Sequence, residues 1–279
     1  MTFSHNVTEH SNAPVVALHS SASNSGQWNQ LKSDLEARFD VFAYDLPGYG
    51  SAALIRDDTQ TGAATSAVPV IAEIEKFARP VHLVGHSNGG AVAIKVALMR
   101  PDLVKSLTLF EPAAFHILAR GKQYETHLFQ HIRQLSDAVT GAAVQGNAGA
   151  GMQEFLDFWN GAGFWNSLPA SRQARFARLI PAVMADFANG LAETWELAEL
   201  ATLTMPCLVM TGLESPEVAH HTSLAIAKAI PGAHIALLPE LGHMAPIFQP
   251  EWVNTRIFAH VASAERPVAN CSWPNQEAA

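Results

Sequence analysis

A serine at position 87 is flanked by glycines at the positions where a sharp strand-to-helix turn needs them. An apolar run leads into "GHSNGG" (85–90), and an alanine-rich helical pattern follows. In such a turn the strained backbone exposes the hydroxyl, and Gly85 and Gly89 avoid a collision where strand and helix pass closely. The N–H of Asn88 then points into the same site from a helix N-terminus, which favours negative charge. The spacing predicts a nucleophile at Ser87; the alternative is a helix-capping serine.

Short apolar runs that alternate with helical patterns must position this turn. We expect strands over residues 15–20, 41–45, 81–85, 104–110, 206–212 and 234–239. We expect helices over residues 26–39, 66–78, 89–100, 217–230 and 250–262. Strands separated by helices of this length predict βαβ units and an α/β fold with a parallel sheet, in which ligands bind at the carboxyl ends of the strands.

The alternation stops in the middle of the chain. Residues 113–203 have a helical pattern with glycine-rich breaks and no convincing strand. We therefore predict a helical cap, or lid, at 113–203, inserted into a core domain formed by 1–112 and 204–263; the alternative is that these helices only cover the sheet. The polar, proline-containing residues 264–279 are expected to be a loosely ordered C-terminal tail.

The composition narrows the class of partner. The chain has 279 residues, of which 48% are hydrophobic, and this is enough for a large core. A net charge of −8 without a basic cluster argues against nucleic acid. We find no signal peptide and no apolar run of the roughly 20 residues that a membrane span needs. Two cysteines, Cys207 and Cys271, indicate neither a disulfide framework nor a metal cluster. We expect a cytoplasmic protein.

Four stretches, in order, resemble motifs of the α/β-hydrolase family. "HSSASNSGQW" (19–28) is similar to the family's oxyanion loop, and "YDLPGYG" (44–50) is similar to its D-x-x-G-x-G turn. "VGHSNGG" (84–90) is similar to its nucleophile elbow, and "LGHMAP" (241–246) is similar to its histidine loop. The resemblance runs from about Val15 to about Ala262. It implies the α/β-hydrolase fold, a mostly parallel sheet of about six or seven strands with helices on both faces and an inserted cap.

Two features depart from that family. The early loop reads His19-Ser20 where the family usually has His-Gly. Only about a dozen residues precede the first strand, which is too few for the family's usual pair of leading strands. We therefore expect at most one strand before Val15.

His243 is the base that the resemblance implies. A serine hydroxyl is a poor nucleophile until a base takes its proton, and the chain has 13 histidines. His243 follows the last strand in a Gly-His turn, from which it can lean towards Ser87. His86 is expected to point away from the nucleophile, His19 to brace the early loop, and the pair at 220–221 to face solvent on a helix.

The acid of the triad is displaced. Where the family most often has Asp, this chain has Ser215, and a hydroxyl cannot replace a carboxylate. Glu111 ends the strand that follows the nucleophile helix, a position that carries the acid in some α/β-hydrolases, and Pro112 stops the strand after it. We favour Glu111; Glu214 is the alternative, and another acid or none is the third. Asp45 is expected to make local hydrogen bonds.

The remaining predictions concern the oxyanion hole and the pocket. Two backbone N–H groups are needed near the developing charge. Asn88 supplies one; the other should come from the early loop, from Ser21 or, as the alternative, Ser20. Residues expected to bind substrate are Ser20, Trp159, Phe164, Trp165 and Met244.

These features predict a carboxylesterase-like serine hydrolase that cleaves an ester, a lactone or a related carbonyl compound through an acyl-enzyme. Such chemistry needs no metal or organic cofactor, and its partner is a small molecule. Carbon–carbon bond hydrolysis and cofactor-free oxygenase or perhydrolase chemistry use the same residues and stay open. So does a non-catalytic small-ligand receptor, because a fold does not fix a function. The oligomeric state, including a homo-oligomer, is left open.

Overall fold

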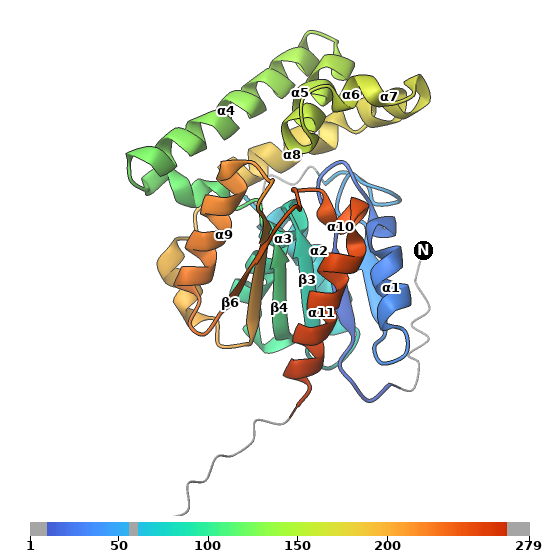
Figure 1. Cartoon of the computed structure of the whole chain (residues 1–279), viewed down its shortest axis with the longest axis vertical. Helices are drawn as coiled ribbons and strands as arrows, with labels where there is room; N and C mark the ends of the chain where they lie inside the picture. Colours follow the sequence, from blue (N-terminus) through green and yellow to red (C-terminus); the bar gives the residue numbers. More distant parts are fainter. Residues whose placement is uncertain (1–9, 56–60, 267–279) are drawn as a thin grey trace, which may run out of the picture.

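The computed structural model describes residues 10–55 and 61–266. Within these ranges six strands form one sheet in the order β2-β1-β3-β4-β5-β6, and every neighbouring pair is parallel (Figure 1). The strands are β1 (Val15–Leu18), β2 (Val41–Tyr44), β3 (Val81–His86), β4 (Val104–Phe110), β5 (Cys207–Gly212) and β6 (His234–Leu238). Parallel strands bring all their carboxyl ends to one edge, which is where loops can build a site.

Helices cover both faces of this sheet, and two apolar clusters fill the space between. Alternate residues of β1 point to opposite faces, so Val16 and Leu18 join one cluster while Val15 and Ala17 join the other. The first cluster includes residues of α2 (Ala64–Glu75), α3 (Asn88–Met99) and α9 (Glu217–Ala229). The second includes residues of η1 (Ser25–Trp28), α1 (Asn29–Leu35), α10 (Ala245–Phe248) and α11 (Pro250–Ala264). A short turn, η2 (Pro101–Leu103), precedes β4.

Between β4 and β5 the described chain is helical, and the helices over residues 123–191 lie above the carboxyl ends of the strands (Figure 1). We call residues 113–203 the cap segment. It contains η3 (Phe115–Arg120), α4 (Gln123–Val144), α5 (Ala148–Asn160), α6 (Phe164–Ser167), α7 (Ala170–Ala177), α8 (Ile180–Leu191) and η4 (Leu197–Thr202). Its side chains form most of a third apolar cluster, which also includes Val218 and Ala219 of α9.

A buried ion pair ties the end of the cap segment to the sheet domain. Glu193 accepts a hydrogen bond from Lys95 of α3 at 3.0 Å and another from the N–H of Ala63 at 2.9 Å. The Glu193 side chain is only 4% exposed. Because breaking one partner of a buried pair leaves the other charge unpaired, this contact fixes where the cap segment rejoins the core.

The expected strands and helices are confirmed, with small changes at their ends. The predicted helix 26–39 divides into η1 and α1, and the last helix continues to Ala264. No strand lies in residues 10–14, while residues 1–9, 56–60 and the predicted tail from 267 lie outside the described residues. Within the described ranges, none of the helices combines the length and apolar character that crossing a membrane requires.

Candidate active site

The turn after β3 holds Ser87 in a backbone conformation that side chains rarely adopt, with φ 53° and ψ −118°. Neighbouring positions must be glycine for steric reasons. A Cβ on Gly85 would lie 2.4 Å from the carbonyl oxygen of Gly89, and one on Gly89 would lie 2.4 Å from that of Leu18. The strand, the helix and β1 therefore approach one another through backbone atoms alone, as the spacing of the glycines predicts.

Three side chains from the ends of three strands meet at this turn. His243 follows β6, and its Nε2 lies 3.1 Å from Ser87 Oγ. Its Nδ1 lies 2.6 Å from Oε2 of Glu111, which follows β4. Ser87, His243 and Glu111 are 6%, 2% and 0% exposed. The serine hydroxyl can thus donate to Nε2 while Nδ1–H donates to the carboxylate, an arrangement that permits proton transfer out of contact with bulk water.

The carboxylate of Glu111 is held from both sides. Its Oε1 accepts hydrogen bonds from Thr211 Oγ1 and from the N–H of Gly212, each at 2.8 Å. Its backbone has a positive φ of 44°, which turns the side chain out of the strand direction. Burial pushes its pKa upward, but hydrogen bonding and charge from His243, with help from Thr211, bring the pKa below its ordinary value. Glu111 therefore stays ionised at neutral pH.

The alternative acid lies elsewhere. Glu214 is exposed, and in the described part of the chain its carboxylate makes no hydrogen bond to His243. Asp45 makes the local bonds expected of it, because its carboxylate accepts from the N–H groups of Ser25 and Ser51 at 2.8 Å.

Two further histidines brace the site in their neutral form. His86 Nε2 donates to the carbonyl of His243 at 2.9 Å, and the Gln27 amide donates to its Nδ1 at 3.1 Å. Burial lowers the pKa of His86 well below its usual range. His19 donates from Nδ1 to the Ser20 carbonyl and accepts from the N–H of Leu46, and burial lowers its pKa to about 4. The expected bracing role of His19 agrees with these bonds.

The expectation for the pair at 220–221 is wrong. Both side chains are half-buried rather than directed into solvent. His220 Nδ1 lies 3.0 Å from Thr211 Oγ1, the hydroxyl that donates to Glu111, and His221 packs against the ring of Tyr124. Helical periodicity could not reveal this, because the contact depends on how α9 packs beside β5.

Backbone N–H groups suited to an oxyanion hole lie beside Ser87. Within the described part of the chain, the N–H groups of Ser21 and Asn88 have no hydrogen-bond acceptor. The N–H of Ser20 instead donates to Gln27 Oε1 at 3.1 Å, as does its hydroxyl. The bond to Gln27 thus favours Ser21 over Ser20 as the second donor. Gln27, which sequence reasoning missed, connects this loop to His86.

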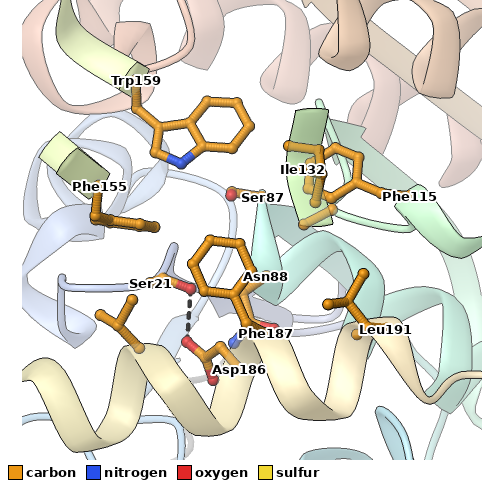
Figure 2. A pocket seen from close by; sticks show the side chains of 13 residues that line it. Ser21, Ser87, Asn88, Phe115, Ile132, Phe155, Trp159, Asp186, Phe187 and Leu191 are labelled. Carbon is orange, nitrogen blue, oxygen red and sulfur yellow. Dashed lines mark hydrogen bonds between the residues drawn. The ribbon is translucent and has the colours of Figure 1, made fainter. Parts of the chain in front are cut away.

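Two adjoining cavities open beside the serine, and both are lined by Ser21, Ser87, Phe155 and Trp159. The outer cavity, of about 460 Å³, is also lined by Ser20, Phe164, His243, Met244, Arg172 and Arg175. The inner cavity, of about 40 Å³, is mainly apolar and is bordered on one side by α8, which carries Asp186, Phe187 and Leu191 (Figure 2). The Trp159 ring stacks on His243, with centroids 4.1 Å apart. Among the described residues, no group of three or more His, Cys, Asp or Glu side chains could hold a metal ion.

One pocket residue was predicted wrongly. Trp165 is buried within the apolar cluster of the cap segment and lines neither of these cavities. Its N–H donates to Asp157 Oδ1 at 2.7 Å, which fixes the start of α6 against α5. The glycines before it turn the chain so that Phe164, and not Trp165, reaches the outer cavity.

The inner cavity contains a carboxyl group that sequence reasoning missed. Asp186 of α8 accepts a hydrogen bond from Ser21 Oγ at 2.5 Å (Figure 2). It accepts another from Tyr49 Oη, also at 2.5 Å. Burial raises its pKa to about 7 against the opposing effects of Ser21, Tyr49 and Asn88. The sequence does contain a sign of this residue, because Asp186 is the one charged residue in the apolar helix "IPAVMADFANGL" (180–191).

With this geometry described, comparisons with known proteins give a consistent result. A sequence model of the alpha/beta hydrolase family matches residues 15–256. A pimeloyl-[acyl-carrier protein] methyl ester esterase from Methylococcus capsulatus is 39% identical over 98 residues, which are 34% of this chain and 35% of that protein. The dihydrolipoyllysine-residue acetyltransferase component of the acetoin cleaving system of Pseudomonas putida is 26% identical over 257 residues, 88% of this chain and 62% of that protein. The matched region is thus less than two thirds of either relative.

Solved structures share the fold. MenH from S. aureus superposes with a TM-score of 0.72 at 18% identity, covering 93% of this chain and 97% of that one. A thermophilic esterase from Thermogutta terrifontis has a TM-score of 0.69 at 22% identity, covering 92% of both chains. The enol-lactonase from Burkholderia xenovorans has a TM-score of 0.64 at 18% identity, covering 91% of this chain and 94% of that one. At these identities the likeness establishes the fold alone.

Proposed function

Because the chain belongs to the α/β-hydrolase family, we propose that it is a serine hydrolase that cleaves an ester, a lactone or a related carbonyl compound. The observation that carries the proposal is the hydrogen-bonded series Ser87–His243–Glu111, with 3.1 Å and 2.6 Å between its atoms. A nucleophile, a base within reach and a group that orients the base are the three parts such chemistry needs.

The reaction follows from these contacts. Ser87 Oγ attacks the substrate carbonyl carbon while its proton passes to His243 Nε2. The carbonyl oxygen becomes negative and accepts hydrogen bonds from the N–H groups of Ser21 and Asn88. The intermediate then collapses, and the leaving oxygen takes the proton from His243. Water next attacks the acyl-enzyme carbonyl carbon and gives a proton to His243. His243 then returns this proton to Ser87 Oγ as the bond between Oγ and the acyl carbon breaks, which releases the acid product and free Ser87.

Two neighbours favour the charged form of His243 during these steps. Glu111 is ionised and accepts from Nδ1–H, so it holds the ring in the tautomer that leaves Nε2 free. Trp159 lies nearly parallel to the imidazole with an angle of 30° between the rings. The face of an aromatic ring attracts a cation by about 0.5–2 kcal/mol, so this stacking stabilises the imidazolium when it forms.

The size and lining of the cavities support a small, mostly hydrophobic substrate. The outer cavity of about 460 Å³ falls within the range of small-molecule sites, about 300–1,000 Å³. Phe155 and Trp159 separate it from the inner cavity, which suits a short apolar acyl or alcohol group. The pimeloyl-[acyl-carrier protein] methyl ester esterase among the similar proteins is named for an ester substrate, which supports the same reaction class here.

A fluorophosphonate probe tests the proposal, because it reacts with an activated serine. We expect the full-length protein to be labelled and to hydrolyse p-nitrophenyl esters, with a preference for short over long acyl chains. Ser87→Ala should lose both labelling and turnover, whereas Ser23→Ala in the neighbouring loop should keep both. A folded wild-type protein that neither reacts with the probe nor hydrolyses any ester of the series would contradict the proposal and favour a ligand-binding role.

A further inference from the structure

Asp186 is a charged residue among mainly apolar neighbours, and its carboxylate accepts two hydrogen bonds. The side chains that line the inner cavity around it are mainly apolar, among them Phe155, Val183, Phe187 and Leu191. A carboxyl group on such a surface is costly unless hydrogen bonds compensate for the lost water. It is nevertheless the one charged group on its helix. The mechanism proposed above does not use it, so its presence beside the nucleophile needs a separate explanation.

The partners of Asp186 come from two different loops of the sheet domain. Ser21 belongs to the loop after β1, and Tyr49 belongs to the turn after β2. Both hydroxyls donate to the same oxygen, Oδ2, at 2.5 Å. Tyr49 is 1% exposed and its ring packs against His19, the residue that braces the same early loop. One carboxylate oxygen of α8 is thus hydrogen-bonded to both loops.

We propose that Asp186 is a positioning residue for the oxyanion hole: through the Ser21 hydroxyl it fixes the backbone N–H of Ser21 in the direction of the substrate carbonyl. This inference rests on the proposed function, because an oxyanion hole matters only if Ser87 attacks a carbonyl. The hydroxyl and the backbone N–H that is to donate both belong to Ser21. A hydrogen bond that holds the hydroxyl therefore also limits rotation of the peptide unit that carries this N–H.

The proposal gives the cap segment a part in catalysis as well as in covering the site. Asp186 lies on α8, while Ser21, Asn88 and Ser87 lie on the sheet domain. The hole is therefore complete only when α8 rests on the two loops. The Asn88 side chain is a further influence on the carboxyl, since it lowers the pKa of Asp186. The hydrogen bond from Ser21 connects one side of the hole to this group of the cap segment.

The test compares turnover with inhibition by a trifluoromethyl ketone, which adds to a catalytic serine and leaves an oxygen anion in the hole. In Asp186→Ala we expect kcat to fall about 10- to 100-fold while KM changes little, because a displaced donor weakens only the transition state. The inhibition constant of the ketone should rise by the factor by which kcat/KM falls. Asp186→Asn keeps an acceptor oxygen and should recover most of the activity.

A double-mutant cycle identifies the route of the effect. If Asp186 acts through Ser21, then Ser21→Ala alone should lower kcat, and adding Asp186→Ala should lower it by no more than about threefold further. Asn189→Ala, on the same helix but outside both cavities, is the matched control and should leave kcat unchanged.

Three results would overturn the inference. They are an unchanged kcat and ketone affinity in folded Asp186→Ala, an unchanged kcat in Ser21→Ala, or losses in the two variants that simply multiply. If Asp186→Ala does not fold, Ser21→Ala still tests the inference, because Ser21→Ala removes only a single hydroxyl. Failure of the proposed function has a different signature: the wild-type protein itself would be unreactive towards the fluorophosphonate.

Discussion

Glu111, the proposed acid of the triad, is the residue whose position is most informative about this chain. The turn after β5 has a serine where a carboxylate is commonly found, and the carboxylate instead ends β4. Glu111 reaches His243 because its backbone turns at φ 44° and because Thr211 and Gly212 hold its second oxygen. The hydrogen bond and charge of His243, with help from Thr211, hold the pKa of this buried carboxyl group below its ordinary value.

We predict opposite outcomes for the two glutamates near the site. Glu111→Gln should lower kcat roughly 10³- to 10⁴-fold, because an amide cannot hold the productive tautomer of His243 or stabilise its cation. Glu214→Gln should leave kcat nearly intact, since the side chain is exposed. Hydrolysis of a short p-nitrophenyl ester measures both, and melting curves show that both variants fold. The reverse ranking would assign the triad acid to Glu214.

Some functional residues could be predicted from the sequence and others could not. Ser87, His243 and Glu111 could be found because strand ends, glycines and residue type limit the choices, and the structure brings the three together. Gln27 and Asp186 could not be found, because their roles depend on contacts between distant segments. The same cause explains the error at Trp165, whose orientation is set by packing inside the cap segment.

At the scale of elements, the strand–turn–helix around Ser87 depends on close backbone contact. A methyl group on Gly89 would meet the carbonyl oxygens of Leu18 and His19 at 2.4 and 2.5 Å. Backbone atoms cannot move aside as a flexible side chain would. The nucleophile turn and the early loop are therefore packed against each other with no space for a side chain.

We predict that Gly89→Ala lowers the free energy of unfolding by several kcal/mol and slows labelling of Ser87, because overpacking forces backbone shifts that typically cost about 1–3 kcal/mol or more. Gly141→Ala is the control. Gly141 lies in α4 with no atom within 4 Å of the added carbon, so this change should be neutral or stabilise by about 0.5–1 kcal/mol. Urea unfolding measures both. Equal stability of the two variants would contradict this account of the turn.

Elements were predicted more reliably than their arrangement. Alternating apolar runs and helical patterns identify β1 to β6, and β4 was predicted with its observed ends. The helical character of the cap segment also follows from its sequence. How α8 lies over the loops after β1 and β2 does not, because helical periodicity shows which face is apolar but not which loops it will meet.

For the whole molecule, buried neutral histidines predict that stability depends on pH. Burial lowers the pKa of His19 from 6.5 to about 4, and it lowers that of His86 in the same direction. Above about pH 6.5 neither the folded nor the unfolded form holds the proton, so stability is complete. As the pH falls towards about 4, only the unfolded chain takes up the proton, and stability is lost.

We predict that the free energy of unfolding falls by about 3 kcal/mol through His19 alone between about pH 7 and about pH 4. Urea unfolding across this range measures the slope. His19→Gln should be less stable at neutral pH but should show a flatter dependence on pH. His234→Gln, which removes an exposed histidine, is the matched control. A wild-type slope in His19→Gln would contradict the prediction.

The distribution of the triad along the chain has a consequence for protein synthesis. Ser87 and Glu111 belong to one unit, β3–α3–β4, whereas His243 follows the last strand. A growing polypeptide therefore releases Ser87 and Glu111 from the ribosome long before His243, the proposed acceptor of the serine's proton. The reactivity of the proposed hydrolase therefore begins only when β6 and the histidine after it have emerged and folded into place.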